Sequence, residues 1–345
     1  MVHWIFIVLG ILMTILWGVM FLKQMRLGLT TTALDDKFTW GLYVQGFFYL
    51  SALAGGTLVF IAVVTLFEIE ALRRLVEVGA AVSFGCLVSG GILLGSDLGK
   101  PFRGFNIIVG KKFASPLTWD FYTLVACAVL NLLLLLGLIP ISGVIATVWS
   151  VLCLIAALGY VMIHTLFFLS RVGAGFRSQP FLGLDTLAQS LWGGMALVTL
   201  IALAVGVEAH HLVKLLLILT ILVLISLAGA HIASLSRKRG GVNQMIIGFD
   251  TLILLILLIT QFSSPNNSIL LAIVSLLILL SVFLEKSHMV KLYQDSPTLP
   301  APYSRFDRVP DYRPTASEWL LAVGSVGICV FLSSAIIYLK STYLG

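Results

Sequence analysis

Long apolar runs alternate with short polar segments along the whole chain. The runs are about 20 residues long, which is the length at which a helix crosses the hydrocarbon core of a bilayer. Inside a bilayer, backbone N–H and C=O groups find partners only within helices or closed barrels. The pattern therefore predicts an all-α integral membrane protein.

We expect ten spanning helices. They cover residues 3–22, 40–66, 75–96, 117–138, 144–170, 184–206, 211–235, 243–262, 268–286 and 317–340. The first run has no basic segment before it and no clear small-residue cleavage site, so we expect a helix there rather than a signal peptide. A single membrane domain should result, with an extra helix and loop (1–39), a first four-helix bundle (40–170), a second four-helix bundle (184–288) and an extra C-terminal helix (317–340).

Composition excludes a soluble enzyme domain. Hydrophobic residues make up 59% of the chain and charged residues 10%, whereas soluble domains carry about 25% charged residues. Each of the four cysteines stands alone in an apolar run: Cys86, Cys127, Cys153 and Cys329. No Cys-x-x-Cys motif is present, so the sequence predicts neither an iron–sulfur cluster nor a zinc site in this chain.

The basic residues are distributed unevenly between the two ends of the predicted helices. Only Arg73, Arg74, Lys214 and Lys340, of 21 Lys and Arg residues, lie outside the odd-numbered loops. The positive-inside rule then places the odd loops in the cytoplasm and both termini outside. Basic loops also suit docking of an acidic soluble partner, so that second cause stays open.

Several polar residues are predicted to reach one membrane face at shallow depth. Helix direction brings Tyr43, Gln45, Asp97, Asp120 and His164 to the side of the odd loops. Ionisable groups inside a membrane are costly and are therefore functional candidates. Structural roles remain open for the same residues, because a buried histidine is often a hydrogen-bonded packing residue, an aspartate at a helix end can act as a cap, and tyrosine is common at membrane interfaces.

These residue types suit the chemistry of a quinone, which exchanges two electrons and two protons. Histidine titrates near neutrality, and a carboxylate behind it can hold the tautomer and relay the proton. We assign His164 as base and Asp120 as relay, with Tyr43 as donor and Gln45 as donor or acceptor. The predicted catalytic residues are His164 and Asp120, and the predicted quinone-binding residues are Trp40, Tyr43, Gln45, Asp97 and His164.

The loop between Asp97 and Asp120 joins two of these helices. It holds four basic residues, Lys100, Arg103, Lys111 and Lys112. Because the chain encodes no redox group of its own, electrons must pass to or from another subunit. We therefore predict that these four residues dock that partner.

Helices six to nine repeat the polar pattern. The separation from Asp120 to Asp250 is 130 positions, and that from His164 to His288 is 124. This spacing indicates a weak internal repeat of two four-helix bundles. A proton path is predicted along Asp185, Gln189, His231, Asp250 and Glu285, with a plain packing role as the alternative for the histidines.

Five segments resemble the polysulfide-reductase membrane-subunit family (NrfD/PsrC type). They are WGLYVQGFFYLSALAGG at 40–56, DLGKPFRGFN at 97–106, SPLTWDF at 115–121, VMIHTLFF at 161–168 and YRPTASEWLLAVGSVG at 312–327. The resemblance implies an eight-helix core in two bundles, extended here to ten helices. It also implies a quinone-interacting anchor subunit of the prokaryotic cytoplasmic membrane, with menaquinone as the expected substrate and no heme or iron–sulfur cluster of its own.

The implied partners are a ferredoxin-like subunit with [4Fe-4S] clusters and a further catalytic subunit, for example one that carries molybdopterin; a nucleic acid is not among them. Many members of the family place the iron–sulfur partner outside the cytoplasm, whereas the charge distribution here places the motif-bearing face inside. Two other functions remain possible. A b-type cytochrome needs paired axial histidines at two depths, and a transporter or proton channel needs broken helices near the midplane.

Overall fold

The computed structural model describes residues 2–34, 38–99, 104, 106, 110, 115–140, 142–170, 181–205, 210–237, 244–263, 267–294 and 312–343. Within these ranges the regular elements are all helical, and ten helices are long and apolar enough to cross a membrane. The predicted fold class, an all-α integral membrane protein with about ten spanning helices, is confirmed.

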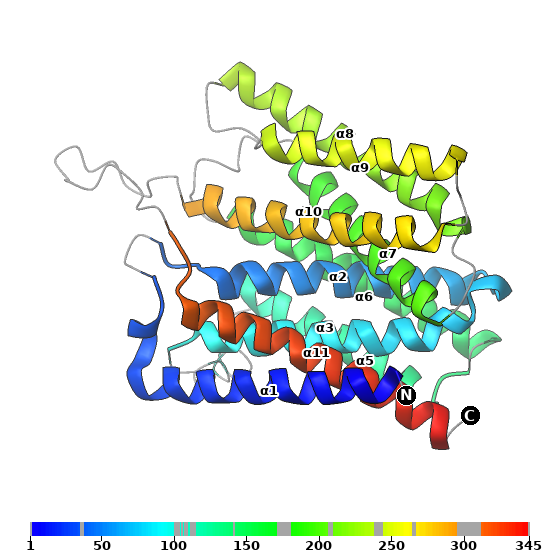
Figure 1. The fold of residues 1–345 in the computed structure, drawn as a ribbon, viewed down its shortest axis with the longest axis horizontal. Helices are drawn as coiled ribbons and strands as arrows, with labels where there is room; N and C mark the ends of the chain where they lie inside the picture. Colours follow the sequence, from blue (N-terminus) through cyan, green and yellow to red (C-terminus); the bar gives the residue numbers. More distant parts are fainter. Residues whose placement is uncertain are drawn as a thin grey trace.

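The long helices follow one another in sequence and lie roughly along one direction (Figure 1). They are α1 (Val2–Leu27), α2 (Leu42–Leu66), α3 (Arg74–Asp97), α5 (Pro116–Leu135), α6 (Val144–Ser170), α7 (Leu182–Val205), α8 (His210–Arg237), α9 (Gln244–Ser263), α10 (Ser268–Gln294) and α11 (Ala316–Tyr343). Two short 3₁₀ helices, η1 (Gly28–Thr31) and η2 (Glu70–Leu72), lie after α1 and before α3.

The helices pack as two bundles of four with two helices outside them. Helices α2, α3, α5 and α6 contact one another in a ring, and α7, α8, α9 and α10 form a second ring. Helix α2 packs on α7 and α10 and is the most buried span, so it joins the bundles. Helix α1 packs chiefly on α11, which in turn packs on α3 at the edge of the first bundle (Figure 1).

Two glycines allow the bundles to touch through their backbones. A Cβ atom added at Gly56 of α2 would lie 1.8 Å from the carbonyl oxygen of Ser190 in α7. One added at Gly194 would lie 2.3 Å from the Gly56 carbonyl carbon. Small residues permit this close approach of membrane helices, so the relative position of the bundles depends on both glycines.

Several predicted helix ends were wrong. Helix α1 continues past residue 22 to Leu27, and α10 continues past residue 286 to Gln294. The polar residues show where each helix passes out of the hydrocarbon region, but the helix itself does not end there. Helix α5 stops before 138, at Leu135. There Gly137 takes a positive φ of 72°, and the N–H groups of Gly137 and Leu138 bond back to the carbonyls of Leu134 and Leu133. This is the Schellman arrangement that commonly ends a helix.

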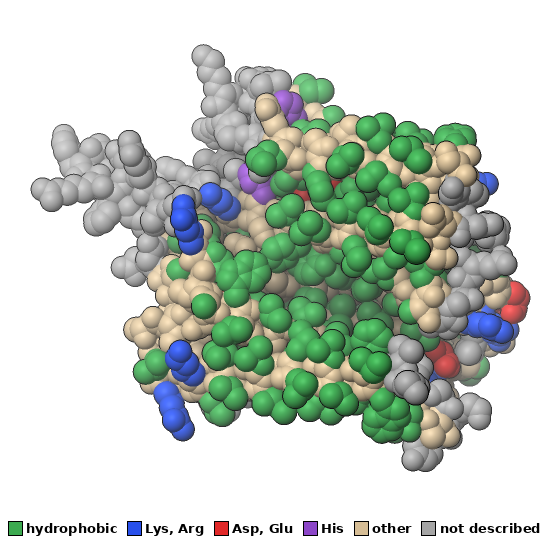
Figure 2. Space-filling model, viewed as in Figure 1, with side chains coloured by type: hydrophobic (Ala, Val, Ile, Leu, Met, Phe, Trp, Pro, Cys, Tyr) green, Lys and Arg blue, Asp and Glu red, His purple; other side chains and the backbone are tan. Residues whose placement is uncertain are grey.

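The surface is that of a membrane protein. Hydrophobic side chains cover the middle of the face shown in Figure 2, while Lys, Arg, Asp and Glu side chains gather toward its two ends. Exposed apolar side chains such as Ile5, Leu12 and Ile15 follow one face of α1. In water such a face would be unfavourable, whereas in a bilayer it contacts lipid tails.

Candidate functional site

The centre of the first bundle holds a paired histidine and carboxylate. Asp120 lies in the second turn of α5 and His164 near the end of α6. The His164 Nε2 and Asp120 Oδ1 atoms are 3.1 Å apart, and both side chains are at most 5% exposed. The contact becomes an ion pair when the imidazole is protonated. Burial makes such a partner necessary, because an unpaired charge inside a membrane is costly.

Aromatic rings enclose this pair. The rings of Phe47 and Phe48, from α2, meet the imidazole of His164 edge-on at centroid distances of 5.8 and 5.1 Å. The Tyr160 ring, one turn before His164, lies 4.9 Å away. The Tyr160 hydroxyl donates to Ser51 Oγ at 2.6 Å. The imidazole is therefore enclosed by a carboxylate on one side and aromatic rings on others. The 3.1 Å contact between His164 Nε2 and Asp120 Oδ1 has the distance of an ion pair but not the geometry of a hydrogen bond.

A second polar group lies where α1 meets α2 and α3. The Tyr43 hydroxyl donates to Gln24 Oε1 at 2.9 Å, and Gln24 Nε2 donates to the Ser96 carbonyl oxygen at 2.5 Å. Asp97 is the residue after Ser96, and its Oδ1 atom is buried without a hydrogen-bond partner among the described residues. Its carboxylate interacts electrostatically with Tyr43 and with Glu318.

Glu318 ties the start of α11 to the segment before α2. Thr315 and Glu318 form a capping box, in which the Thr315 N–H donates to Glu318 Oε2 at 2.8 Å and the Glu318 N–H donates to Thr315 Oγ1 at 3.2 Å. The carboxylate also accepts from the Ala33 N–H at 3.0 Å and the Tyr312 hydroxyl at 2.6 Å. That hydroxyl accepts in turn from the Leu42 N–H. Burial, and next the bond to Glu318, raise the pKa of Tyr312, so it stays a donor.

The remaining predicted binding residues sit nearby without a shared contact to His164. The backbone of Trp40 makes two hydrogen bonds with the Gln294 side chain. The Trp40 N–H donates to Gln294 Oε1 at 2.8 Å, and the Trp40 carbonyl accepts from Gln294 Nε2 at 2.9 Å. Gln45 is buried in the first turn of α2. The structure thus divides the predicted set into an Asp120–His164 group and a Tyr43–Asp97 group. The predicted docking residues Lys100, Arg103, Lys111 and Lys112 lie outside the described residues.

The second bundle buries a larger ionisable cluster at its core. Asp185 accepts from Gln189 Nε2 at 2.7 Å and from Ser226 Oγ at 2.9 Å. Asp250 accepts from Ser281 Oγ. Glu285, on α10, interacts electrostatically with both aspartates. Four of the five predicted proton-path residues are therefore brought together, while His231 is only partly buried on α8.

A lysine completes this cluster. Lys286 is 3% exposed and interacts electrostatically with Asp185 and Glu285. Within the described residues, Gln189 Oε1 is buried with no hydrogen-bond donor, and the Asp250 and Glu285 carboxyl groups are hydrogen-bonded to each other. Buried acceptors without donors are uncommon in folded proteins and often mark functional groups or sites of water.

Sequence reasoning missed several members of these groups. Gln24 lay beyond the predicted end of the first helix, and Lys286 was counted as a loop charge. The Thr315-x-x-Glu318 pattern at the start of the last helix was a readable capping signal. Ser51, Tyr160, Ser226 and Ser281 carry no sequence signal, because their role depends on which helices pack together.

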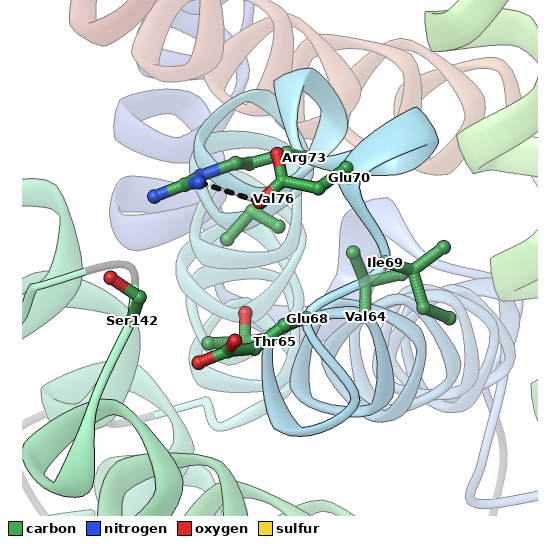
Figure 3. A pocket seen from close by; sticks show the side chains of 8 residues that line it. All are labelled: Val64, Thr65, Glu68, Ile69, Glu70, Arg73, Val76 and Ser142. Carbon is green, nitrogen blue, oxygen red and sulfur yellow. Dashed lines mark hydrogen bonds and ion pairs between the residues drawn. The ribbon is translucent and has the colours of Figure 1, made fainter.

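A small surface hollow lies at the other end of the first bundle (Figure 3). It is lined by Val64, Thr65, Glu68, Ile69, Glu70, Arg73, Val76 and Ser142. Its ion pair, Arg73 Nη1 to Glu70 Oε1 at 2.9 Å, is exposed, and such pairs contribute little stability. None of the predicted site residues lines it. Among the described residues, no group of three or more His, Cys, Asp or Glu is placed to hold a metal ion.

Comparison with known proteins gives two partial matches. The chain is 31% identical over 108 residues to a "Putative dimethyl sulfoxide reductase membrane subunit" of Halobacterium salinarum, covering 31% of this chain and 25% of that protein. It is 26% identical over 93 residues to a selenate reductase subunit of Mesobacillus selenatarsenatis, covering 27% of this chain and 22% of that protein. The chain thus matches about a quarter of the length of these relatives, and no protein-family model matches it. Both matches confirm the resemblance that the motifs indicated, to the NrfD/PsrC-type membrane subunits of oxidoreductases.

Proposed function

We propose that this chain is the membrane anchor of a respiratory oxidoreductase complex and that it reacts with quinone or quinol beside the His164–Asp120 pair. The named relatives, one a membrane subunit of a reductase and the other a reductase subunit, support the anchor role. The quinone chemistry is supported by the pair itself, which is buried, 3.1 Å apart and surrounded by aromatic rings. That pair is the single observation on which the proposal rests most.

The chemistry needs both a base and a route for the proton. Oxidation of a quinol breaks two O–H bonds and yields one quinone, two protons and two electrons. His164 accepts a proton from the ligand hydroxyl, and Asp120 stabilises the imidazolium that forms. In the reverse direction the same imidazolium returns a proton to the quinone. The aromatic rings supply flat apolar surfaces against which a quinone ring packs.

The electrons pass to or from a neighbouring subunit that carries [4Fe-4S] clusters. The motif-bearing loop between α3 and α5 is the proposed docking segment, because its four basic residues would attract an acidic surface of the partner. A further catalytic subunit beyond it would reduce or oxidise the terminal substrate. The chain's own task in this assembly is to bind the quinone, hold its headgroup and move its protons.

The test uses the complex purified from native membranes. We expect an iron–sulfur subunit to co-purify, and we expect His164→Ala and Asp120→Asn each to lower quinol-dependent turnover by a factor on the order of 10² or more. Reduction of the clusters by dithionite should be unchanged in both variants. Glu77→Gln, which removes a carboxylate that pairs with Lys340 at the far end of the same bundle, is the matched control. Full quinol turnover in both site variants would refute the proposal.

We further propose that the carboxyl cluster of the second bundle moves protons during turnover. The hydrogen bond between the buried Asp250 and Glu285 side chains favours this role, because two carboxyl groups that bond to each other share a proton. We expect Asp250→Asn and Glu285→Gln to reduce proton uptake by the complex in vesicles while quinol oxidation continues. Unchanged proton uptake per electron in both variants would count against proton movement and leave the quinone proposal intact.

A further inference from the structure

The hydrogen bonds of Gln24 determine which way the Tyr43 hydroxyl points. The Ser96 carbonyl is one of the last of α3, so its helical partner is missing, and it can only accept a hydrogen bond. Gln24 must therefore turn its N–H₂ toward Ser96, and does so at 2.5 Å. This leaves the amide oxygen of Gln24 facing Tyr43. Since that oxygen has no proton, the Tyr43 hydroxyl must donate to it, at 2.9 Å.

A phenol has a single O–H donor, and that of Tyr43 is already hydrogen-bonded to Gln24. Toward any other group, Tyr43 presents only oxygen lone pairs. The neighbouring Asp97 has a buried Oδ1 without a hydrogen-bond partner among the described residues. At this end of the proposed site the Tyr43 oxygen is thus an acceptor, whereas the sequence analysis expected Tyr43 to donate to the quinone.

Acceptors discriminate between the two redox forms of the ligand. A hydroquinone carries two O–H donors, whereas a quinone carries two carbonyl acceptors. A quinone carbonyl oxygen placed against the Tyr43 oxygen would leave two buried acceptors facing each other, which is unfavourable. A site built to hydrogen-bond a substrate hydroxyl rejects the analogue that lacks it.

We propose that Gln24 is a positioning residue that fixes Tyr43 as a hydrogen-bond acceptor, so that this site binds hydroquinone more tightly than quinone. The inference rests on the proposed quinone function and adds to it a residue from α1, a helix outside both bundles. The Tyr43 side chain is buried against Leu93 and Leu321 and is covered by Trp17, Met20 and Phe21. These three covering side chains are only partly buried and belong to α1.

The experiment compares two constants on the purified complex. They are the KM for a short-chain naphthohydroquinone and the inhibition constant for the corresponding naphthoquinone. Wild-type complex should show the lower value for the hydroquinone. Gln24→Met has nearly the volume of glutamine but cannot accept from Tyr43, so the freed hydroxyl can donate to a quinone carbonyl. We expect the preference for hydroquinone to fall by about 3- to 10-fold, the effect of one hydrogen bond.

Two further variants make the result decisive. Tyr43→Phe removes the acceptor and should raise the hydroquinone KM while leaving the quinone inhibition constant unchanged. Gln261→Met, near the C-terminal end of α9, controls for loss of a partly buried glutamine elsewhere. If Gln24 had only a structural role, Gln24→Met would raise the hydroquinone KM and the quinone inhibition constant together. That result, or a preference for hydroquinone that matches the Gln261→Met variant, overturns the inference. Should Gln24→Met fail to assemble, Tyr43→Phe decides alone.

The outcomes also separate this inference from the proposed function. A wild-type complex that neither oxidises hydroquinone nor is inhibited by quinone refutes both. A complex that turns over hydroquinone but prefers the quinone form, or shows the same preference in the Tyr43→Phe variant, refutes the role of Gln24 alone.

Discussion

At the scale of single residues, the two bundles stabilise their buried ionisable groups with different partners. In the first, one histidine and one carboxylate face each other at 3.1 Å. In the second, Lys286 lies among carboxylates, near Asp185 and Glu285. A buried lysine without a counter-ion would be very costly, so Asp185 and Lys286 should stabilise each other, whatever the cluster does in turnover.

That dependence can be measured with a double-mutant cycle. We expect Lys286→Met to lower the free energy of unfolding by about 3–5 kcal/mol, because it leaves buried carboxylates unpaired. Combining it with Asp185→Asn should cost less than the sum of the single changes. The more exposed pair Glu77–Lys340 is the control, with an expected coupling of about 0–1 kcal/mol. The measurement is unfolding of the detergent-solubilised wild type, the two single variants and the double variant. Additive effects of Asp185→Asn and Lys286→Met would contradict the pairing.

The sequence indicated many of these residues but not their grouping. His164 and Asp120 could be paired from helix direction alone, because both lie a few residues inside the membrane at the same face. Tyr43 and Asp97 were placed at that face too, and Tyr43 lies one turn before Phe47 on α2, with its hydroxyl bonded to Gln24. Gln24 was missed because a run of hydrophobic residues does not show where the helix continues beyond the lipid.

At the scale of elements, α2 organises the molecule. It contributes to the His164 surroundings through Phe47 and Phe48, to the second group through Tyr43, and to the bundle interface through Gly56. A sequence shows that α2 is rich in glycine, but not which glycine faces another backbone. To identify that glycine, one must know which helix packs against α2.

The glycine contacts yield a direct prediction. Gly56→Ala would place a methyl group against the α7 backbone, where no flexible side chain can move aside. We expect it to destabilise the protein by about 1–3 kcal/mol or more through overpacking. Gly159→Ala, on α6, has nothing within 4 Å of the added Cβ and should be neutral or slightly stabilising. Thermal unfolding of both variants tests this, and equal melting temperatures would contradict the close approach.

At the scale of the whole molecule, the fold was predictable and the topology remains a prediction. Length and hydropathy of the runs suffice for ten helices, since the bilayer permits little else. The bundle arrangement followed from the repeat and the family resemblance. The orientation of the molecule across the membrane rests on the charge distribution, which partner docking would also explain.

Cysteine labelling in intact cells distinguishes the two explanations. The native cysteines are buried, so they give little background. Ser142→Cys lies at the end of the first bundle opposite the basic loops and Thr39→Cys at the end of the basic loops, and both positions are exposed. If the basic loops are cytoplasmic, a membrane-impermeant maleimide labels Ser142→Cys but not Thr39→Cys. The opposite pattern would show that the basic loops serve partner docking outside the cytoplasm.

The central claim, quinone chemistry at the His164–Asp120 pair, is tested most directly by rapid mixing. The purified complex is mixed with hydroquinone, and reduction of the partner's iron–sulfur clusters is followed before turnover begins. We predict fast reduction in the wild type and a rate lower by a factor on the order of 10² in Asp120→Asn, with Glu77→Gln unaffected. Equal rates in wild type and Asp120→Asn would show that the pair takes no part in the reaction and would contradict the account.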